Sequence, residues 1–183
     1  MRRVVVTGIG IVSSIGNNTE EVYNSLIHGK SGITKNEDMA SYGFRSQIAG
    51  NIKLDVSEHV DERSLRFMGP GAAYAHIAME QAINDSGLTE HEVSNIRTGL
   101  VAGSGGPSTS AMLTAHQTVL KNSSPKRIGP FAVPKCMSST ISANLATAYK
   151  IKGINYSITS ACSTSLHCIG NCLLYTSDAA DEL

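Results

Sequence analysis

The sequence predicts an α/β fold in which a largely parallel sheet lies between helices. Three runs of apolar and β-branched residues, at 4–12, 98–103 and 155–160, are typical of strands that are covered on both faces. Amphipathic helical patterns separate these runs. Because strands and helices alternate along the chain, we expect neighbouring strands to run parallel and to be connected through helices.

The chain begins with the predicted strand at 4–12, and a helix follows it. Asn18 and Thr19 are typical N-cap residues, and Gly29 ends the helical pattern. Residues 30–60 show only weak alternation of apolar residues, so we expect a loop with short strands there.

The next segment predicts two helices and a short third one. A helical turn starts at Asp61 and stops at the break 69–71, and a helix rich in alanine follows over 72–86, closed by Gly87. Thr89 begins a capping-box pattern, which predicts one further turn of helix.

The last third of the chain repeats the alternation. The second predicted strand leads into a glycine turn and a helix at 108–120, and a polar loop precedes a helix at 138–150, for which Gly153 is the expected cap. The third predicted strand runs directly into a helix over 163–171.

Composition narrows the classes of function. Lys plus Arg is 15 and Asp plus Glu is 15 in 183 residues, so the zero net charge argues against a nucleic-acid or polybasic membrane protein. Hydrophobic residues at 41% and charged residues at 16% argue against disorder. No apolar run approaches the roughly 20 residues of a membrane span, and the four cysteines lack the spacing of a secreted framework. We therefore expect a cytoplasmic domain, or half of a larger protein, without membrane insertion.

The strongest candidate for chemistry is Cys162, which lies where the third predicted strand turns into a helix. The N–H groups of a first helical turn lack acceptors within the helix, and their dipoles favour a thiolate. The small neighbours Ala161 and Ser163 leave room for a thioester. The pattern predicts a nucleophilic cysteine, and a buried structural cysteine is the alternative.

Two glycine groups resemble nucleotide-binding motifs only superficially. Gly8, Gly10 and Gly16 depart from the dinucleotide-binding spacing and indicate a tight turn or close packing. The glycines at 103–106 lack the Lys-Ser/Thr of a phosphate loop, and we interpret them as a flexible segment beneath the active site.

A zinc cluster is a further alternative, but its spacing is poor. Cys136, Cys162, His167, Cys168 and Cys172 contain no paired C-x-x-C motif, so we expect no metal site. We expect Cys168 to be a small apolar residue on a helix face. We expect His167 to pack or to form a hydrogen bond, directed away from the thiol of Cys162.

Several motifs resemble those of β-ketoacyl-acyl-carrier-protein synthases, most closely the bacterial type I enzymes. The run SITSACSTSLHCIGN at 157–171 resembles the active-site segment of that family. Further matching blocks occur in the same order at 6–18, 29–33, 66–68, 99–106, 129–130 and 135–137. The resemblance covers residues 1–171, and we interpret 172–183 as a non-homologous tail left by truncation.

The resemblance implies the N-terminal half of a thiolase-like fold, with a mixed sheet between helical layers, and a homodimer when the enzyme is whole. It implies that Cys162 accepts an acyl group from the phosphopantetheine thioester of acyl carrier protein. Malonyl-carrier protein then loses carbon dioxide, and its carbanion attacks the acyl-cysteine in the Claisen condensation of fatty-acid elongation. No cofactor beyond the substrate's phosphopantetheine is implied.

The family's two catalytic histidines, its lysine and its second oxyanion donor belong to the second half. None of the six histidines here matches them, so we expect the chain as printed not to catalyse condensation. A non-catalytic fragment that binds the carrier protein or dimerises is one alternative. Another acyltransferase with a thiolase fold is the second.

The resemblance also implies residues for docking and for the acyl chain. Arg63, Arg66, Lys126 and Arg127 fall in the family's docking region, where basic side chains attract an acidic carrier protein. Met137 is an acyl-pocket residue by its place in the motif. From the residues alone, the basic groups are equally well a solvated face, and Met137 is a core residue.

Overall fold

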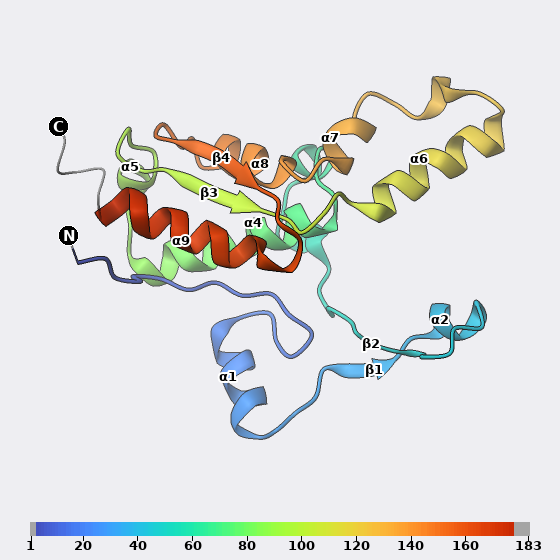
Figure 1. Ribbon diagram of the computed structural model, residues 1–183, viewed down its shortest axis with the longest axis horizontal. Helices are drawn as coiled ribbons and strands as arrows, with labels where there is room; N and C mark the ends of the chain where they lie inside the picture. The colour runs from blue at the N-terminus through green and yellow to red at the C-terminus, as the bar shows by residue number, and fades with distance from the viewer. Residues whose placement is uncertain (1–2, 178–183) are drawn as a thin grey trace.

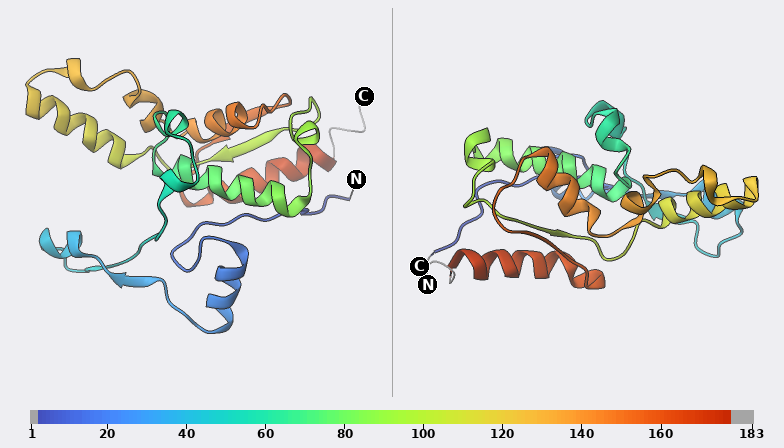
Figure 2. Two further views of the ribbon diagram at one scale, coloured as in Figure 1. Left: turned by 180° about the vertical axis from the view of Figure 1, so that it is seen from behind. Right: turned by 90° about the horizontal axis from the view of Figure 1, so that it is seen from above.

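In the computed structural model, which describes residues 3–177, two parallel strands lie between layers of helices. β3 (Leu100–Gly103) pairs in parallel with β4 (Asn155–Ile158). Figure 2 shows α9 (Thr164–Ser177) on one face of this pair and α8 (Thr140–Ala148) on the other, with α4 (Pro70–Ser86) packed against α8. The predicted α/β fold with parallel strands between helices is confirmed.

The remaining elements surround this layered body. Figure 1 shows β1 and β2, with α2 between them in the chain, extending away from it as an antiparallel arm in which Ile33 lies opposite Gly50. These elements are α1 (Thr19–Ile27), β1 (Ile33–Lys35), α2 (Glu37–Ser41), β2 (Ile48–Gly50), η1 (Val56–Glu58), α3 (Glu62–Leu65), α5 (Glu90–Val93), α6 (Thr109–Asn122), η2 (Pro125–Arg127), α7 (Ala132–Cys136) and η3 (Ala161–Ser163).

The largest cluster of buried apolar residues lies between α4 and α8. Alanines on α4 let the two helices approach closely, while larger residues from the preceding segment and from α8 fill the remaining volume. The cluster consists of Val60, Met68, Ala72, Ala73, Ile77, Ile141 and Leu145. Leu100 and Ala102 of β3 pack against it, so the helical core is continuous with the strand that leads to the candidate site.

The predicted strand at 4–12 is wrong. This segment forms no ladder with any strand among the described residues. Val5 and Val6 are 61% and 80% exposed, so the segment is not buried on both faces. β-branched residues favour extended backbone, but a strand also requires a neighbouring strand for its N–H and C=O groups.

The 4–12 segment is held instead along the side of α4. The N–H of Ile9 donates to Asp85 Oδ2 at 2.9 Å, and that of Ile11 donates to Gln81 Oε1 at 3.0 Å. A Cβ added at Gly10 would overlap the backbone of Ala78 on α4, and one added at Gly8 would overlap that of Ala82. Close packing is therefore what these two glycines permit, as predicted.

The helix-end signals were reliable where they were local. Asn18 caps α1 by accepting from Glu21 N at 2.9 Å. Gly87 ends α4 with φ 69°, and Thr89 forms the predicted capping box with Glu92. α4 starts at Pro70, earlier than predicted, because proline is well suited to a first helical turn.

The prediction that Gly153 caps the helix over 138–150 is wrong. α8 ends at Ala148 with Tyr149 as its C-cap, and Lys150 takes the left-handed conformation with φ 51°. Gly153 serves a different purpose, because its N–H donates to Thr98 O at 3.1 Å and a Cβ would lie only 2.6 Å from that oxygen. α2 and α7 are short helices that the sequence patterns did not indicate.

At its C-terminal end the described structure is helical. α9 continues through Ser177, so the first part of the segment predicted as a tail, 172–177, belongs to this helix. The rest of that segment, 178–183, lies outside the described residues. Among residues 3–177, no helix has the length and apolar character needed to cross a bilayer.

Candidate active site

Cys162 is exposed on the sharp turn between β4 and α9. β4 ends at Ile158, a 3₁₀ turn covers Ala161–Ser163, and α9 starts at Thr164. Ala161 has φ 50°, the left-handed region that L-residues with a Cβ rarely occupy. The chain therefore reverses direction just before Cys162, which places that residue at the start of the helix as the sequence predicted.

Thr164 fastens the turn from inside. This residue is only 3% exposed, and its Oγ1 accepts from Ser160 N at 2.9 Å and donates to Ala161 O at 2.8 Å. The N–H of Ser163 donates to Ser160 O at 3.1 Å. Two of these three hydrogen bonds share the Thr164 hydroxyl, which serves as acceptor and donor at once. Together, the three bonds hold the backbone on both sides of Ala161.

The glycine segment at 103–106, which begins at the last residue of β3, supports the same turn through close contact. A Cβ added at Gly103 would overlap the Ile158 carbonyl and would lie 2.8 Å from Thr164 Cγ2. One added at Gly105 would lie 3.0 Å from Ala161 O. Neither glycine has a positive φ, so the turn does not need their conformational freedom. It needs the absence of a side chain, because that absence permits the close approach. We interpreted this segment as flexible, but the structure shows its packing function.

A side-chain bond also spans the turn. Ser160 Oγ lies 2.7 Å from His167 Nδ1, which joins the residue before the turn to α9. His167 was expected to pack or to form a hydrogen bond, and the hydrogen bond is present. Within the described part of the chain, no hydrogen bond joins His167 to Cys162.

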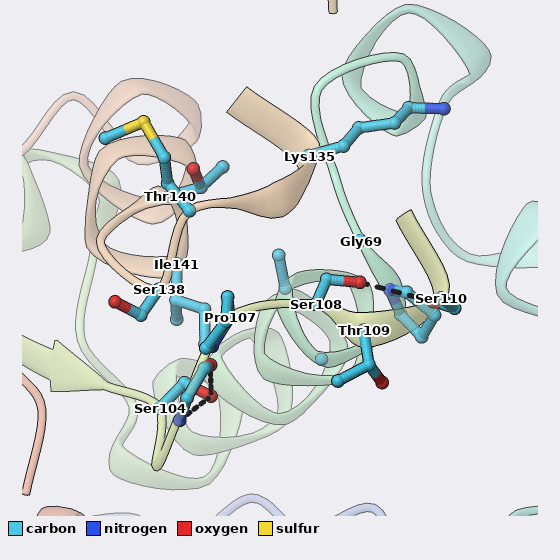
Figure 3. Close-up of a pocket in the computed structure, with 15 residues that line it drawn as sticks. Gly69, Ser104, Pro107, Ser108, Thr109, Ser110, Lys135, Ser138, Thr140 and Ile141 are labelled. Carbon is cyan, nitrogen blue, oxygen red and sulfur yellow. Dashed lines mark hydrogen bonds between the residues drawn. The ribbon is translucent and has the colours of Figure 1, made fainter. Parts of the chain in front are cut away.

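A cavity of about 250 Å³ is lined by residues from the segments that follow β3 and α7 and from the starts of α4, α6 and α8 (Figure 3). Most of the lining residues are small, and in Figure 3 the Lys135 side chain extends away from Ser104 and Pro107. Ser138, which lines the cavity, accepts from Thr159 Oγ1 at 3.2 Å, so the lining is bonded to the end of β4. Cys162 is not one of the described residues that line it.

Met137 is one of the residues that line this cavity. It also lines a second hollow beside α8 that is walled by Phe67 and Val133. Its side chain is 50% exposed, so on this chain Met137 is not a core residue. An exposed, flexible methionine between two hollows has the physical character expected of a residue that adapts to an apolar chain.

The four basic residues predicted for docking are all exposed. Arg63 and Arg66 lie in and just after α3, and Lys126 and Arg127 lie in η2. The ion pairs of residues 3–177 join Lys35 to Glu37 and Lys150 to Glu90, so none of the four is neutralised by an ion pair. The ring of Phe67, next to Arg66, packs edge-on against that of Phe131, with 4.8 Å between the ring centroids. This contact connects the α3 region to the start of α7.

The cysteines differ in their surroundings. Cys168 is 9% exposed on the inner face of α9, as predicted, and burial raises the pKa of its thiol. Burial also raises the pKa of the Cys172 thiol. All four cysteines are free, and no group of three or more His, Cys, Asp or Glu residues converges as a metal site within 3–177.

Sequence reasoning did not identify the contributions of Thr164 and Ser160. A Thr near the start of a helix is a recognisable capping signal, so the sequence held a local cue for the two hydrogen bonds of the Thr164 hydroxyl. The pairing of Ser160 with His167 had no cue beyond the placement of both residues on either side of the predicted turn.

An α/β body that presents a cysteine on a strand-to-helix turn is characteristic of the thiolase-like fold. The chain belongs to the β-ketoacyl synthase family, because the model of the family's N-terminal domain matches residues 1–174. It is 56% identical over 171 residues to 3-oxoacyl-[acyl-carrier-protein] synthase 1 of Haemophilus influenzae. That match covers 93% of this chain and 42% of the relative, so the chain spans less than half of the relative's length.

Solved structures show the same fold. A β-ketoacyl synthase from Burkholderia phymatum superimposes with a TM-score of 0.80 at 24% identity, covering 97% of this chain and 44% of that one. A type II PKS acyl-carrier protein in complex with its ketosynthase gives a TM-score of 0.73 at 18% identity, covering 97% of this chain and 47% of that one. The predicted thiolase-like fold, as the N-terminal half, is confirmed.

Proposed function

We propose that this chain supplies the acyl-accepting half of a β-ketoacyl-acyl-carrier-protein synthase of fatty-acid elongation, with Cys162 as nucleophile. The observation that carries the proposal is the exposed thiol on the strained, well-fastened turn between β4 and α9. The family membership and the name of the Haemophilus influenzae relative support the same assignment.

In the proposed first step, the Cys162 thiolate attacks the carbonyl carbon of an acyl-phosphopantetheine thioester. A new carbon–sulfur bond forms at Cys162, the original one breaks, and the carrier's sulfur leaves and takes up a proton. In this proposal, N–H groups at the start of α9 stabilise the negative charge that develops on the carbonyl oxygen, and one such donor is worth about 3 to 4 kcal/mol in other enzymes.

In the second step, malonyl-carrier protein loses carbon dioxide, and the resulting carbanion attacks the acyl-Cys162 carbonyl. The carbon–sulfur bond to Cys162 breaks, which regenerates the thiolate and releases a β-ketoacyl thioester. By resemblance, the histidines and the lysine of this step belong to the second half of the family's fold. We therefore propose acyl transfer, without condensation, as the reaction of residues 1–183 alone.

The proposed donor is acyl carrier protein, docked by electrostatic attraction. The ketosynthase captured with its acyl-carrier protein is a structural neighbour of this chain, which supports a carrier protein as partner. The exposed Arg63, Arg66, Lys126 and Arg127 would attract an acidic carrier, and Met137 would contact the acyl chain. Because the phosphopantetheine arm arrives with the substrate, the proposed chemistry needs no resident cofactor.

We also propose that the whole enzyme is a cytoplasmic homodimer. Four free cysteines suit a reducing compartment. Large apolar side chains on the outer side of α9, among them Leu166, Ile169 and Leu173, are half or more exposed, which suits a surface covered in a larger assembly.

The proposal is tested by incubating the chain with an acyl-loaded carrier protein and locating the acyl group by peptide mass spectrometry. We expect an acyl thioester on Cys162 and none in Cys162→Ser, while Cys172→Ser, which alters the exposed cysteine of α9, remains acylated. Binding of the carrier without acylation would favour a non-catalytic fragment. Acylation from a small-molecule thioester but not from the carrier would favour another acyltransferase of this fold.

A further inference from the structure

We propose that the hydrogen bond between Ser160 and His167 is a clamp that positions Cys162 at the start of α9. The role assigned to the clamp rests on the proposed acyl transfer to Cys162. Ser160 and His167 are positioning residues in this proposal, because neither contacts the thiol within the described structure.

The clamp spans the strained point of the chain. Ser160 immediately precedes Ala161, whose φ of 50° is unfavourable for a residue with a Cβ. Such a conformation persists only where surrounding contacts hold it. Thr164 and the Ser163 N–H fasten the backbone of the turn, and the Ser160 hydroxyl is the side-chain connection from the strand end to the body of α9.

The chemistry of the two groups makes the bond durable. A serine hydroxyl both donates and accepts, so it can donate to an unprotonated Nδ1 or accept from a protonated one. The 2.7 Å bond can therefore form with either neutral tautomer and with the imidazolium ion. This tolerance suits a positioning device, whereas a general base would work in one protonation state only.

Loss of the clamp should release the turn and move Cys162 away from the N–H groups of α9. N–H groups at a helix N-terminus interact favourably with a nearby anion, by an amount that corresponds to a rate change of about two- to fivefold. The bond is made by Nδ1, so asparagine, whose amide lies near the place of Nδ1, can replace the imidazole. Glutamine places its amide near Nε2 instead and cannot.

The test measures alkylation of the 183-residue chain by iodoacetamide, resolved cysteine by cysteine with peptide mass spectrometry. We expect Ser160→Ala, His167→Ala and His167→Gln to slow alkylation of Cys162 by about two- to fivefold. Ser160→Thr and His167→Asn should retain the rate of the unmodified chain. Cys172, further along α9, is the internal reference, and its alkylation rate should be the same in every variant. His116→Asn on α6 is the matched surface control, and it should leave the alkylation rate of Cys162 unchanged.

Three results would contradict the proposed role of the clamp. One is an unchanged Cys162 rate in both alanine variants. The second is equal rescue by glutamine and asparagine at 167, and the third is a parallel change of the Cys172 rate, which would mean that the effect is not specific to the turn. Alkylation needs no carrier protein, so the expected pattern together with a failure to form acyl-Cys162 would refute the proposed function and leave the clamp standing.

Discussion

Replacing Gly103 with alanine should disrupt the support beneath Cys162. Gly103 is the last residue of β3 and lies opposite Ile158, the last residue of β4. The added methyl group would overlap the Ile158 carbonyl oxygen, and it would lie 3.0 Å from the carbonyl carbon and 2.8 Å from Thr164 Cγ2. The substitution therefore strains the strand pair and the threonine that fastens the turn.

The size of the effect follows from these distances. Ordinary carbon–carbon contact is about 3.5 to 4.0 Å, so β4 and Thr164 must each retreat by about 1 Å. Backbone of a paired strand cannot rotate away as a side-chain tip can. Overpacking of this kind costs about 1 to 3 kcal/mol, and we expect the upper part of that range because the obstacle is backbone.

Gly106→Ala is the matched control for Gly103→Ala. It lies in the same glycine segment, has no positive φ, and an added Cβ meets nothing within 4 Å. Urea unfolding followed by circular dichroism should show a loss of about 2 to 3 kcal/mol for Gly103→Ala and a change within about 0.5 kcal/mol for Gly106→Ala. Equal midpoints for Gly103→Ala and the unmodified chain would refute the packing role of Gly103.

Three further perturbations test other parts of the structure. Burial lowers the pKa of His76, against smaller opposing effects of Glu80 and Asp61, and its Nδ1 has no partner in the described chain. Because the pKa of His76 in the folded chain lies below the ordinary 6.5, the unfolded chain binds the proton more readily. The free energy of unfolding should therefore fall as the pH drops through 6.5 towards the folded pKa. In thermal melts, His76→Phe should flatten this dependence of stability on pH. Gly170→Ala, inside α9 with open space at the Cβ position, should raise stability by about 1 kcal/mol in urea titrations, and a loss would contradict the helical environment. Charge reversal at Arg63 and Lys126 should slow acyl transfer from carrier protein by about tenfold at low salt and leave transfer from a small thioester unchanged; an equal rate from carrier protein would remove these residues from docking.

Much of the secondary structure was predictable because its signals are local. The cap of Asn18, the left-handed Gly87 and the capping box at Thr89 each depend on bonds within a few residues, and all three occur as predicted. The prediction at 4–12 failed because pairing depends on a distant strand. A run of valines and isoleucines favours extended backbone, but it contains no information about what lies alongside.

The candidate site divides in the same way. Cys162 was predictable because the strand run and the helical pattern meet at that residue. The function of Gly103 was not, because its missing side chain matters only relative to Ile158, which is 55 residues away in the chain and adjacent in the sheet. A glycine cluster read without its neighbours indicates flexibility, whereas here it permits contact.

The contacts that place Cys162 come from within the described chain. The strained Ala161, the hydroxyl of Thr164 and the close approach of Gly103 all lie on β3, β4, α9 or the turns between them. In the proposed mechanism, acyl transfer needs a positioned thiol and nearby N–H donors, whereas decarboxylation and condensation need further acid–base groups. It follows that the two half-reactions separate along the chain. A Ser160 or His167 variant of a complete enzyme should therefore slow the acylation of Cys162, whereas the loss of carbon dioxide from malonyl-carrier protein should keep its rate.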